Sequence, residues 1–344
     1  MRSPIATDGT VPRVVVTGGA GFIGSHLVEQ LLAEGHEVHV VDDLSTGRLA
    51  NLAAVANDHH LHVHELDVAD FDALLPVMRG CEQVHHLAAL ADIVPSIERP
   101  LSYAHANVDG TMAVLEAARQ CGISRFVYAA SSSCYGIPDA FPTAEDAQCR
   151  PQYPYALTKY LGEQAVMHWA QVYGLPAVAL RLFNVYGPRS RTGGTYGAMF
   201  GVFLAQKLAG RPFTVVGDGT QSRDFTFVTD VADAFVRAAA SDLSGVSLNV
   251  GTGRPASVNR IVELLGGDVV HVPKRPGEPD CTHADVSRIT QMLGWRARID
   301  IETGVHTLLA NIADWREAPV WTPATIADAT SAWFQHLGRG ADAR

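Results

Sequence analysis

The sequence predicts an α/β protein built on a doubly wound parallel sheet (a Rossmann fold), and three observations lead to this fold class. Short apolar segments that suit buried strands alternate with longer amphipathic segments that suit helices. A glycine-rich turn, Gly18 to Gly24, joins the first such strand to the first helix. An acidic pair, Asp42 and Asp43, ends the second strand about twenty residues further on.

The expected elements alternate along the first half of the chain. Residues 13–17 form the first strand, and the helix that the glycine turn opens extends to about Ala33. Further strands are expected over residues 37–41, 61–66, 83–87 and 125–130, and helices over residues 71–78, 100–120 and 153–173.

Charge and composition exclude several classes of partner. The 344 residues are 47% hydrophobic and 18% charged, as in an ordinary soluble protein. The formal net charge of −10, without a basic tract, argues against nucleic acid or an anionic membrane. No apolar run reaches the ~18 residues of a membrane-spanning helix, and residues 1–12 are polar, expected to be disordered, and lack the apolar core of a signal peptide. We therefore expect a cytoplasmic protein.

Cysteines and histidines do not indicate a metal centre. Histidines cluster in residues 59–64 and 85–86, where alternation along half-buried strands explains them without a ligand role. The cysteines are widely spaced and form no CxxC pair, so we expect them to be reduced and structural: Cys81, Cys121, Cys134, Cys149 and Cys281.

The order of strand, glycine turn and helix is the one that a dinucleotide needs. Glycines permit positive φ and let the backbone approach a pyrophosphate, while the helix N-terminus supplies N–H groups. Asp42 is placed to accept from the adenosine ribose hydroxyls, and two carboxylates there would repel a 2′-phosphate. The expected cofactor is NAD rather than NADP, although Arg48 lies close by and would weaken this exclusion.

Tyr155 and Lys159 are candidates for acid–base chemistry. Four residues apart at the start of a helix, they share one face, and a lysine charge there favours tyrosinate. This spacing also arises by chance on many amphipathic helices. The serines of residues 131–133 follow the strand at 125–130, and loops after parallel strands meet at one edge of a sheet. Serines, tyrosine and lysine are therefore expected to face one crevice.

Eight motifs in a fixed order resemble the extended short-chain dehydrogenase/reductase family. Within it, the chain is most similar to NAD-dependent nucleotide-sugar epimerases and dehydratases of the UDP-glucose 4-epimerase type, from about residue 13 to about residue 312. The motifs are TGGAGFIG, HHLAAL, AASSSCYG, PYALTK, RLFNVYGPR, GDGTQSRDFTFV, NVGTG and RPGEPDCTHAD followed by LGW.

The resemblance implies roles for individual residues. Ser131, Tyr155 and Lys159 match the catalytic positions, and Asn107 matches a residue that supports the backbone or holds water near the lysine. The implied cofactor-binding residues are Gly18, Gly21, Phe22, Ile23, Gly24, Asp42, Asp67, Val68, Leu87, Ala88, Ala89, Asn107, Tyr155 and Lys159. The implied substrate-binding residues are Ala91, Ser133, Asn184, Arg191, Arg223, Arg275 and Thr282, with the arginines at 223 and 275 on the diphosphate.

The implied reaction is inversion of a sugar at carbon 4 through a transient 4-keto intermediate, with tightly bound NAD regenerated. Dehydration is disfavoured, because Ser132-Ser133 replaces the Asp-Glu that dehydratases carry after the catalytic hydroxyl. Thr282, where a tyrosine restricts relatives to unsubstituted hexoses, and the small Ala91 leave room for an acetamido group. UDP-GlcNAc/UDP-GalNAc are therefore expected beside UDP-Glc/UDP-Gal.

Other readings remain open at this point. Residues 189–197 depart from the family pattern and keep uronic acids and other nucleotides possible. A related NAD-dependent decarboxylase, reductase or epimerase at another carbon is the main alternative, and a non-catalytic NAD-binding regulator is a remote one.

The implied architecture has two interleaved units and a homodimer. The cofactor unit is expected over residues 11–182 and 224–253, and the sugar-nucleotide unit over 183–223 and 254–344. Dimer packing is expected through the helices near 100–120 and 153–173. The second departure from the family is the extension from Asp314, where Thr322 and Pro323 begin one helix that packs on the body or a partner, or closes over the substrate. One face of that helix carries Ile326, Ala329, Trp333, Phe334 and Leu337.

Overall fold

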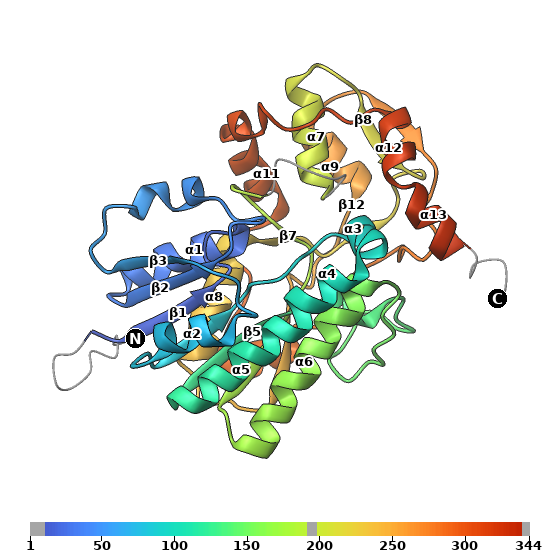
Figure 1. Cartoon of the computed structure of the whole chain (residues 1–344). Helices are drawn as coiled ribbons and strands as arrows, with labels where there is room; N and C mark the ends of the chain where they lie inside the picture. The colour runs from blue at the N-terminus through green and yellow to red at the C-terminus, as the bar shows by residue number, and fades with distance from the viewer. Residues whose placement is uncertain (1–10, 191–197, 339–344) are drawn as a thin grey trace.

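The computed structural model describes residues 11–190 and 198–338 and is organised around a seven-stranded parallel sheet (Figure 1). The strand order is β11-β6-β5-β4-β1-β2-β3, which extends the Rossmann order 3-2-1-4-5-6 by one strand. The predicted fold class is confirmed. The strands are β1 (Arg13–Thr17), β2 (Glu37–Asp42), β3 (Leu61–Glu65), β4 (Gln83–His86), β5 (Arg125–Ser131), β6 (Ala177–Leu182) and β11 (Val246–Val250).

Helices cover both faces of the sheet because its strands are apolar on both sides. Val14, Val15 and Val16 of β1 are completely buried, as expected of a central parallel strand. One face packs on α1 (Phe22–Ala33) and α8 (Val228–Ala239), and the other on α2 (Phe71–Met78), α5 (Gly110–Cys121) and α6 (Pro154–Tyr173). A 3₁₀ helix, Leu49–Val55, follows β2.

A smaller part stands beside the carboxyl ends of the strands (Figure 1). It has its own core, in which Tyr186, Phe200, Phe225 and Phe227 pack ring against ring. Its strands pair as β7 (Val185–Tyr186) with β10 (Thr226–Phe227), β8 (Phe213–Val216) with β13 (Val269–Val272), and β9 (Ser222–Arg223) with β12 (Ala256–Ser257). Its helices are α7 (Met199–Leu208), α9 (Val258–Leu265), α11 (Ile301–Ala310) and the 3₁₀ helix Ile312–Trp315.

Two helical predictions need correction. The long helix expected over 100–120 consists of α4 (Pro100–Ala104), a π-helical turn (His105–Asp109) and α5, and an unpredicted α3 (Ile93–Glu98) precedes it. The single C-terminal helix is divided into α12 (Pro323–Ala329) and α13 (Ser331–Leu337). The break falls at buried Thr330, whose hydroxyl donates to the Ile326 carbonyl 2.8 Å away, a bond that bends helices. Thr322 and Pro323 begin α12 as expected.

Segments from the later part of the chain return to the core around the sheet. α8 and β11 contribute to it, as do Ile289 of α10 (Ser287–Leu293) and the nearby Trp295. Phe225 and Phe227 belong instead to the core of the smaller part, and the division into two units stays a prediction. Among the described residues, no helix is long and apolar enough to cross a membrane. Most of the N-terminal segment expected to be disordered, residues 1–10, lies outside the described residues.

Candidate active site

The loops that follow the strands converge at one edge of the sheet, where β1 lies between β2 and β4. The strand order reverses at this point, which is where doubly wound sheets bind ligands. The glycine turn follows β1, residues 87–90 follow β4, and Ser131 ends β5. Most of the residues predicted for cofactor and catalysis therefore lie along this edge.

The glycine turn fits a dinucleotide pyrophosphate. Gly18 has a φ of +69°, and a Cβ there would lie 2.7 Å from the Ala88 nitrogen, so only glycine allows this approach. A Cβ at Gly24 would lie 2.1 Å from the Gly18 carbonyl oxygen, which keeps α1 close to the turn. Gly21 caps α1 without a side-chain hydrogen bond, so the first N–H groups of the helix, from Phe22 and Ile23, are offered to an anion.

Asp42 is held rigidly at the end of β2. Its two carboxylate oxygens accept from the backbone N–H groups of Ala20 and Leu44, both at 3.0 Å. Burial raises the pKa of the Asp42 carboxyl, and these two bonds oppose the rise. Asp43 instead turns its carboxylate to the Ser45 hydroxyl at 2.6 Å. Asp42 is thus the carboxylate placed beside the glycine turn, where a ribose is expected.

The other predicted cofactor residues divide into surface and core positions. Asp67 is half exposed and lies 3.3 Å from His105, whereas the Val68 side chain is buried in the core next to Gly110. After β4, the backbone N–H groups of Leu87 and Ala88 both donate to the Thr17 hydroxyl at 3.2 Å. This fixes the segment 87–89 against β1 and the glycine turn.

Asn107, predicted near the cofactor, connects two segments of the site through its side chain. It is fully buried, and its amide oxygen accepts from the Leu90 N–H at 2.8 Å. Its amide nitrogen donates to the Leu90 carbonyl and to the Thr158 hydroxyl, both at 3.0 Å, which uses both amide N–H groups. The π-helical turn that carries Asn107 therefore ties the strand end at 87–90 to α6.

The structure brings the predicted hydroxyls together. Ser131 and Ser133 have hydroxyl oxygens 2.8 Å apart, and the Ser133 N–H donates to Ser131 at 3.2 Å. Both lie at the start of the 3₁₀ helix Ser132–Tyr135. The Tyr155 hydroxyl, in the first turn of α6, donates to the Ser131 oxygen at 3.5 Å. A sugar hydroxyl placed here would meet both groups.

Lys159 follows Tyr155 by one helical turn but points at an aromatic face. It is 4% exposed, and its Nζ lies 4.4 Å from the centroid of the Tyr128 ring. Burial lowers the pKa of Lys159 to about 7, although the Glu163 charge opposes this. The predicted lowering of the tyrosine pKa is wrong, because burial raises the pKa of Tyr155 more than the Ser131 bond lowers it.

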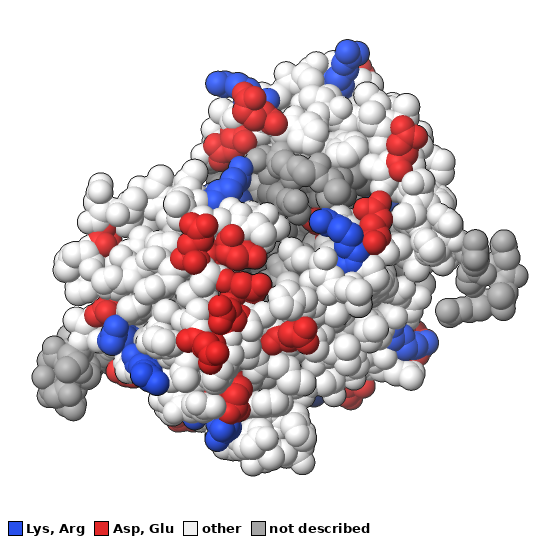
Figure 2. Space-filling model, viewed as in Figure 1, with Lys and Arg blue, Asp and Glu red and all other residues white. Residues whose placement is uncertain are grey.

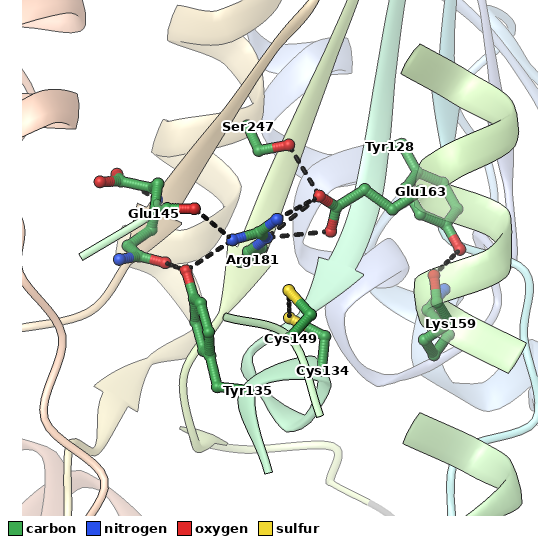
Figure 3. Close-up of polar contacts among 10 residues, drawn as sticks. Tyr128, Cys134, Tyr135, Glu145, Cys149, Lys159, Glu163, Arg181 and Ser247 are labelled. Atoms are coloured by element: carbon green, nitrogen blue, oxygen red, sulfur yellow. Dashed lines mark hydrogen bonds and ion pairs between the residues drawn. The ribbon is translucent and has the colours of Figure 1, made fainter. Parts of the chain in front are cut away.

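A buried ion pair behind the catalytic helix was not predicted. Arg181 of β6 contacts the Glu163 carboxylate with its Nε at 3.0 and 3.1 Å and with Nη2 at 2.7 Å (Figure 3). Arg181 also donates to the Tyr135 hydroxyl and the Glu145 carbonyl, and Ser247 donates to Glu163. The sequence feature that could have indicated this ion pair is the single arginine within the otherwise apolar strand 177–182. The pair fixes α6, which carries Tyr155 and Lys159, to the sheet.

Two of the scattered cysteines meet beside this pair. The Cys149 thiol donates to the Cys134 sulfur at 3.7 Å (Figure 3). When Cys149 is ionised, the Cys134 thiol donates to its thiolate instead, which lowers the pKa of Cys149 to about 7, while the same bond and burial raise the pKa of Cys134. Cys134 directly follows Ser133, so the thiol pair adjoins the catalytic segment.

The predicted substrate residues form two groups in the smaller part. Asn184 is exposed, and its amide oxygen accepts from the Thr282 hydroxyl at 2.8 Å. Arg223 and Arg275 approach the same carboxylate, Glu278, at 2.9 and 3.7 Å. The contact of Glu278 with both arginines was not predicted, although Glu278 stands only three residues after Arg275 in the motif RPGE. Ala91 is exposed just before α3, and Arg191 lies outside the described residues.

Arg223 and Arg275 place positive charge locally in a chain whose net charge is negative. Acidic side chains predominate on the face shown in Figure 2, in keeping with the formal net charge of −10. Two guanidinium groups against one carboxylate leave a local excess of one positive charge at Arg223, Arg275 and Glu278.

The histidines take structural contacts within the sheet, and His86 does so directly behind this edge. His86 is buried in β4 and bonds the hydroxyls of Thr17 and Thr111. Glu37, His39 and His62 on β2 and β3 have ligand atoms within 4.8 Å of one another, but Arg13 already contacts the Glu37 carboxylate at 3.0 Å.

Comparison with known proteins places this geometry in a family. The NAD dependent epimerase/dehydratase family matches residues 14–251. The chain belongs to this family. UDP-glucose 4-epimerase of Mycolicibacterium smegmatis is 38% identical over 303 residues, covering 85% of this chain and 96% of that protein.

Solved structures agree with this assignment. UDP-N-acetylglucosamine 4-epimerase from Methanobrevibacter ruminantium, in complex with UDP-N-acetylmuramic acid, has a TM-score of 0.82 at 33% identity and covers 88% of this chain and 99% of its own. UDP-glucose 4-epimerase from Thermus thermophilus, in complex with NAD, has a TM-score of 0.79 at 33% identity with the same coverage. The glycine turn and Asp42 are accordingly the part of the site suited to NAD.

Proposed function

We propose that the protein is a nucleotide-sugar 4-epimerase that acts on UDP-hexoses through a transient 4-keto intermediate. The observation that carries this proposal is the Tyr155 hydroxyl 3.5 Å from the Ser131 hydroxyl, at the edge of the sheet suited to NAD. The names of the similar proteins support both the reaction class and the UDP-sugars.

Each catalytic residue has a distinct task in this mechanism. Tyr155 removes the proton from the sugar 4-hydroxyl and later returns it, and Ser131 donates a hydrogen bond to the forming keto oxygen. The Ser133 N–H at the Ser131 oxygen orients that hydroxyl. Burial disfavours the tyrosinate form of Tyr155, and the proposed task of protonated Lys159, one helical turn away, is to offset that effect. The glycine turn and Asp42 would hold NAD, which would supply the reversible redox chemistry at carbon 4.

The substrate diphosphate is assigned to Arg223 and Arg275, with Asn184 beside them. The Arg223 and Arg275 side chains are 11% and 13% exposed, so they are held by their surroundings and need little ordering on binding. Their net positive charge against Glu278 suits a diphosphate better than a neutral sugar.

The sugar site is proposed to admit 2-acetamido groups. Thr282 turns its hydroxyl toward Asn184 and also accepts from the Asp224 N–H at 3.1 Å, so its short side chain is fully engaged. Ala91 is small and exposed. Both UDP-Glc/UDP-Gal and UDP-GlcNAc/UDP-GalNAc are therefore expected to turn over.

The homodimer is proposed to form through α5 and α6. These helices pack side by side on one face of the sheet (Figure 1). Their outer surfaces carry exposed apolar residues, including Met112 at 44%, Leu157 at 47% and Leu161 at 44%. Sedimentation of L157E/L161E should show a monomer where the native protein shows a dimer.

The proposal is tested by incubating purified protein with a panel of nucleotide sugars, without added NADH, and identifying products by NMR. A pair of C4 epimers reached from either side supports it. Decarboxylated or reduced products, or inversion at another carbon, would replace it with the corresponding alternative.

A further inference from the structure

The C-terminal helix α13 places one buried aromatic side chain between the two parts of the molecule. Trp333 is 3% exposed, although it lies only a few residues before the end of the described chain. Figure 1 shows α13 beside α3, which lies on the other side of the boundary between the parts. The helix belongs to the extension from Asp314, where the sequence departs from the family pattern.

On one side, Trp333 touches the segment that carries a predicted diphosphate ligand. Its indole N–H donates to the Pro276 carbonyl at 2.8 Å. Its ring lies 5.4 Å from the guanidinium carbon of Arg275, the neighbouring residue. The aromatic face therefore fixes the position of the Arg275 guanidinium.

On the other side, Trp333 touches the segment that carries the catalytic tyrosine. Its ring centroid is 6.3 Å from that of Tyr153, which in turn stacks on Tyr155 at 6.4 Å. α13 also packs on α3, which begins directly after Ala91 and Asp92. The Trp333 side chain therefore connects Arg275, proposed to bind the diphosphate, with the segment around Tyr155 and with α3.

We propose that Trp333 is a positioning residue for substrate binding, and that α12 and α13 form a strap that sets the distance between Arg275 and the catalytic edge. This inference rests on the proposed function, in which Arg275 binds the substrate diphosphate. Without the ring, Arg275 loses the surface that fixes its orientation, and it then has to be ordered by the ligand.

The inference is tested with W333A and W333F, and with F334A as the matched control on the same helix. Phe334 is 39% exposed, so its loss should leave binding within twofold. The dissociation constant of UDP, measured by calorimetry, should rise about tenfold in W333A, since a cation–π contact and one hydrogen bond are lost. W333F keeps an aromatic ring but loses the indole N–H, so its dissociation constant for UDP should rise only about threefold.

Steady-state measurements separate positioning from a general structural role. KM for the UDP-sugar should rise in parallel with the UDP dissociation constant, while kcat and the content of bound NAD stay within about twofold. Unchanged UDP affinity in W333F and W333A, or an equal loss in F334A, would overturn the inference. UDP binding without epimerisation by the native protein would refute the proposed function alone, and native protein that does not bind UDP would refute both.

Discussion

Replacement of Glu163 by glutamine perturbs the ion pair that anchors the catalytic helix. The Glu163 and Arg181 side chains are 2% and 7% exposed, so the remaining guanidinium would be left as a buried charge without a counter-ion. The new amide N–H₂ would also face the N–H groups of Arg181, and the bond from Ser247 would weaken.

The expected cost follows from this burial. Breaking one partner of a buried ion pair costs about 3 to 5 kcal/mol. With a urea dependence of ~3 kcal/mol/M, the unfolding midpoint of E163Q should fall by roughly 1 to 1.7 M. The loss of unfolding free energy is this large because water cannot solvate the unpaired, buried Arg181 charge.

E116Q is the matched control, because Glu116 forms an equally short but exposed pair with Arg119 on α5. Solvent screens that pair, so its loss should cost less than ~1 kcal/mol. Urea denaturation followed by far-UV circular dichroism compares the two variants. If E163Q unfolds within 0.3 M of E116Q, a shift of ~1 kcal/mol at most, the account of the Arg181 network is refuted.

Three further predictions concern the site itself. Y155F should lower kcat by about 10² to 10⁴-fold while NAD stays bound, as measured by turnover and by the NAD released on denaturation; unchanged turnover contradicts the acid–base assignment. T282Y should lower turnover of UDP-GlcNAc at least about tenfold relative to UDP-Glc, because the phenol fills the space beside Asn184; an unchanged ratio removes that argument. Alkylation of Cys149 by iodoacetamide should accelerate as pH rises through about 7. Cys81 should stay unlabelled, because burial raises its pKa to about 11. If peptide mapping finds Cys81 labelled first at neutral pH, the account of the thiol pair is contradicted.

Local sequence signals predicted most of the sheet and its cofactor edge. The valine-rich strand before Gly18 and the turn itself determine their own conformation, so β1 and α1 lie where they were expected. The meeting of Ser131 with Tyr155 followed from the rule that loops after parallel strands share an edge. The break between α12 and α13 at Thr330 could not be predicted, because the apolar face of a helix carries no information about a hydrogen bond from a side chain to the backbone.

Long-range contacts account for what the sequence could not predict. Arg181 and Glu163 are 18 residues apart, Arg223 and Glu278 are 55 apart, and Trp333 lies 57 residues from Pro276. No periodicity or spacing connects such pairs. The pKa of Tyr155 was misjudged for a related reason, since burial depends on the packing of several elements.

The central claim is that a hydrogen leaves carbon 4 of the sugar and returns to the same carbon within one site. UDP-glucose deuterated at carbon 4, incubated with the protein in ordinary water, tests this directly by NMR and mass spectrometry of the products. The account predicts UDP-galactose that retains the deuterium at carbon 4 without added NADH. Loss of the label to solvent, or retention of configuration with net oxidation, would contradict it.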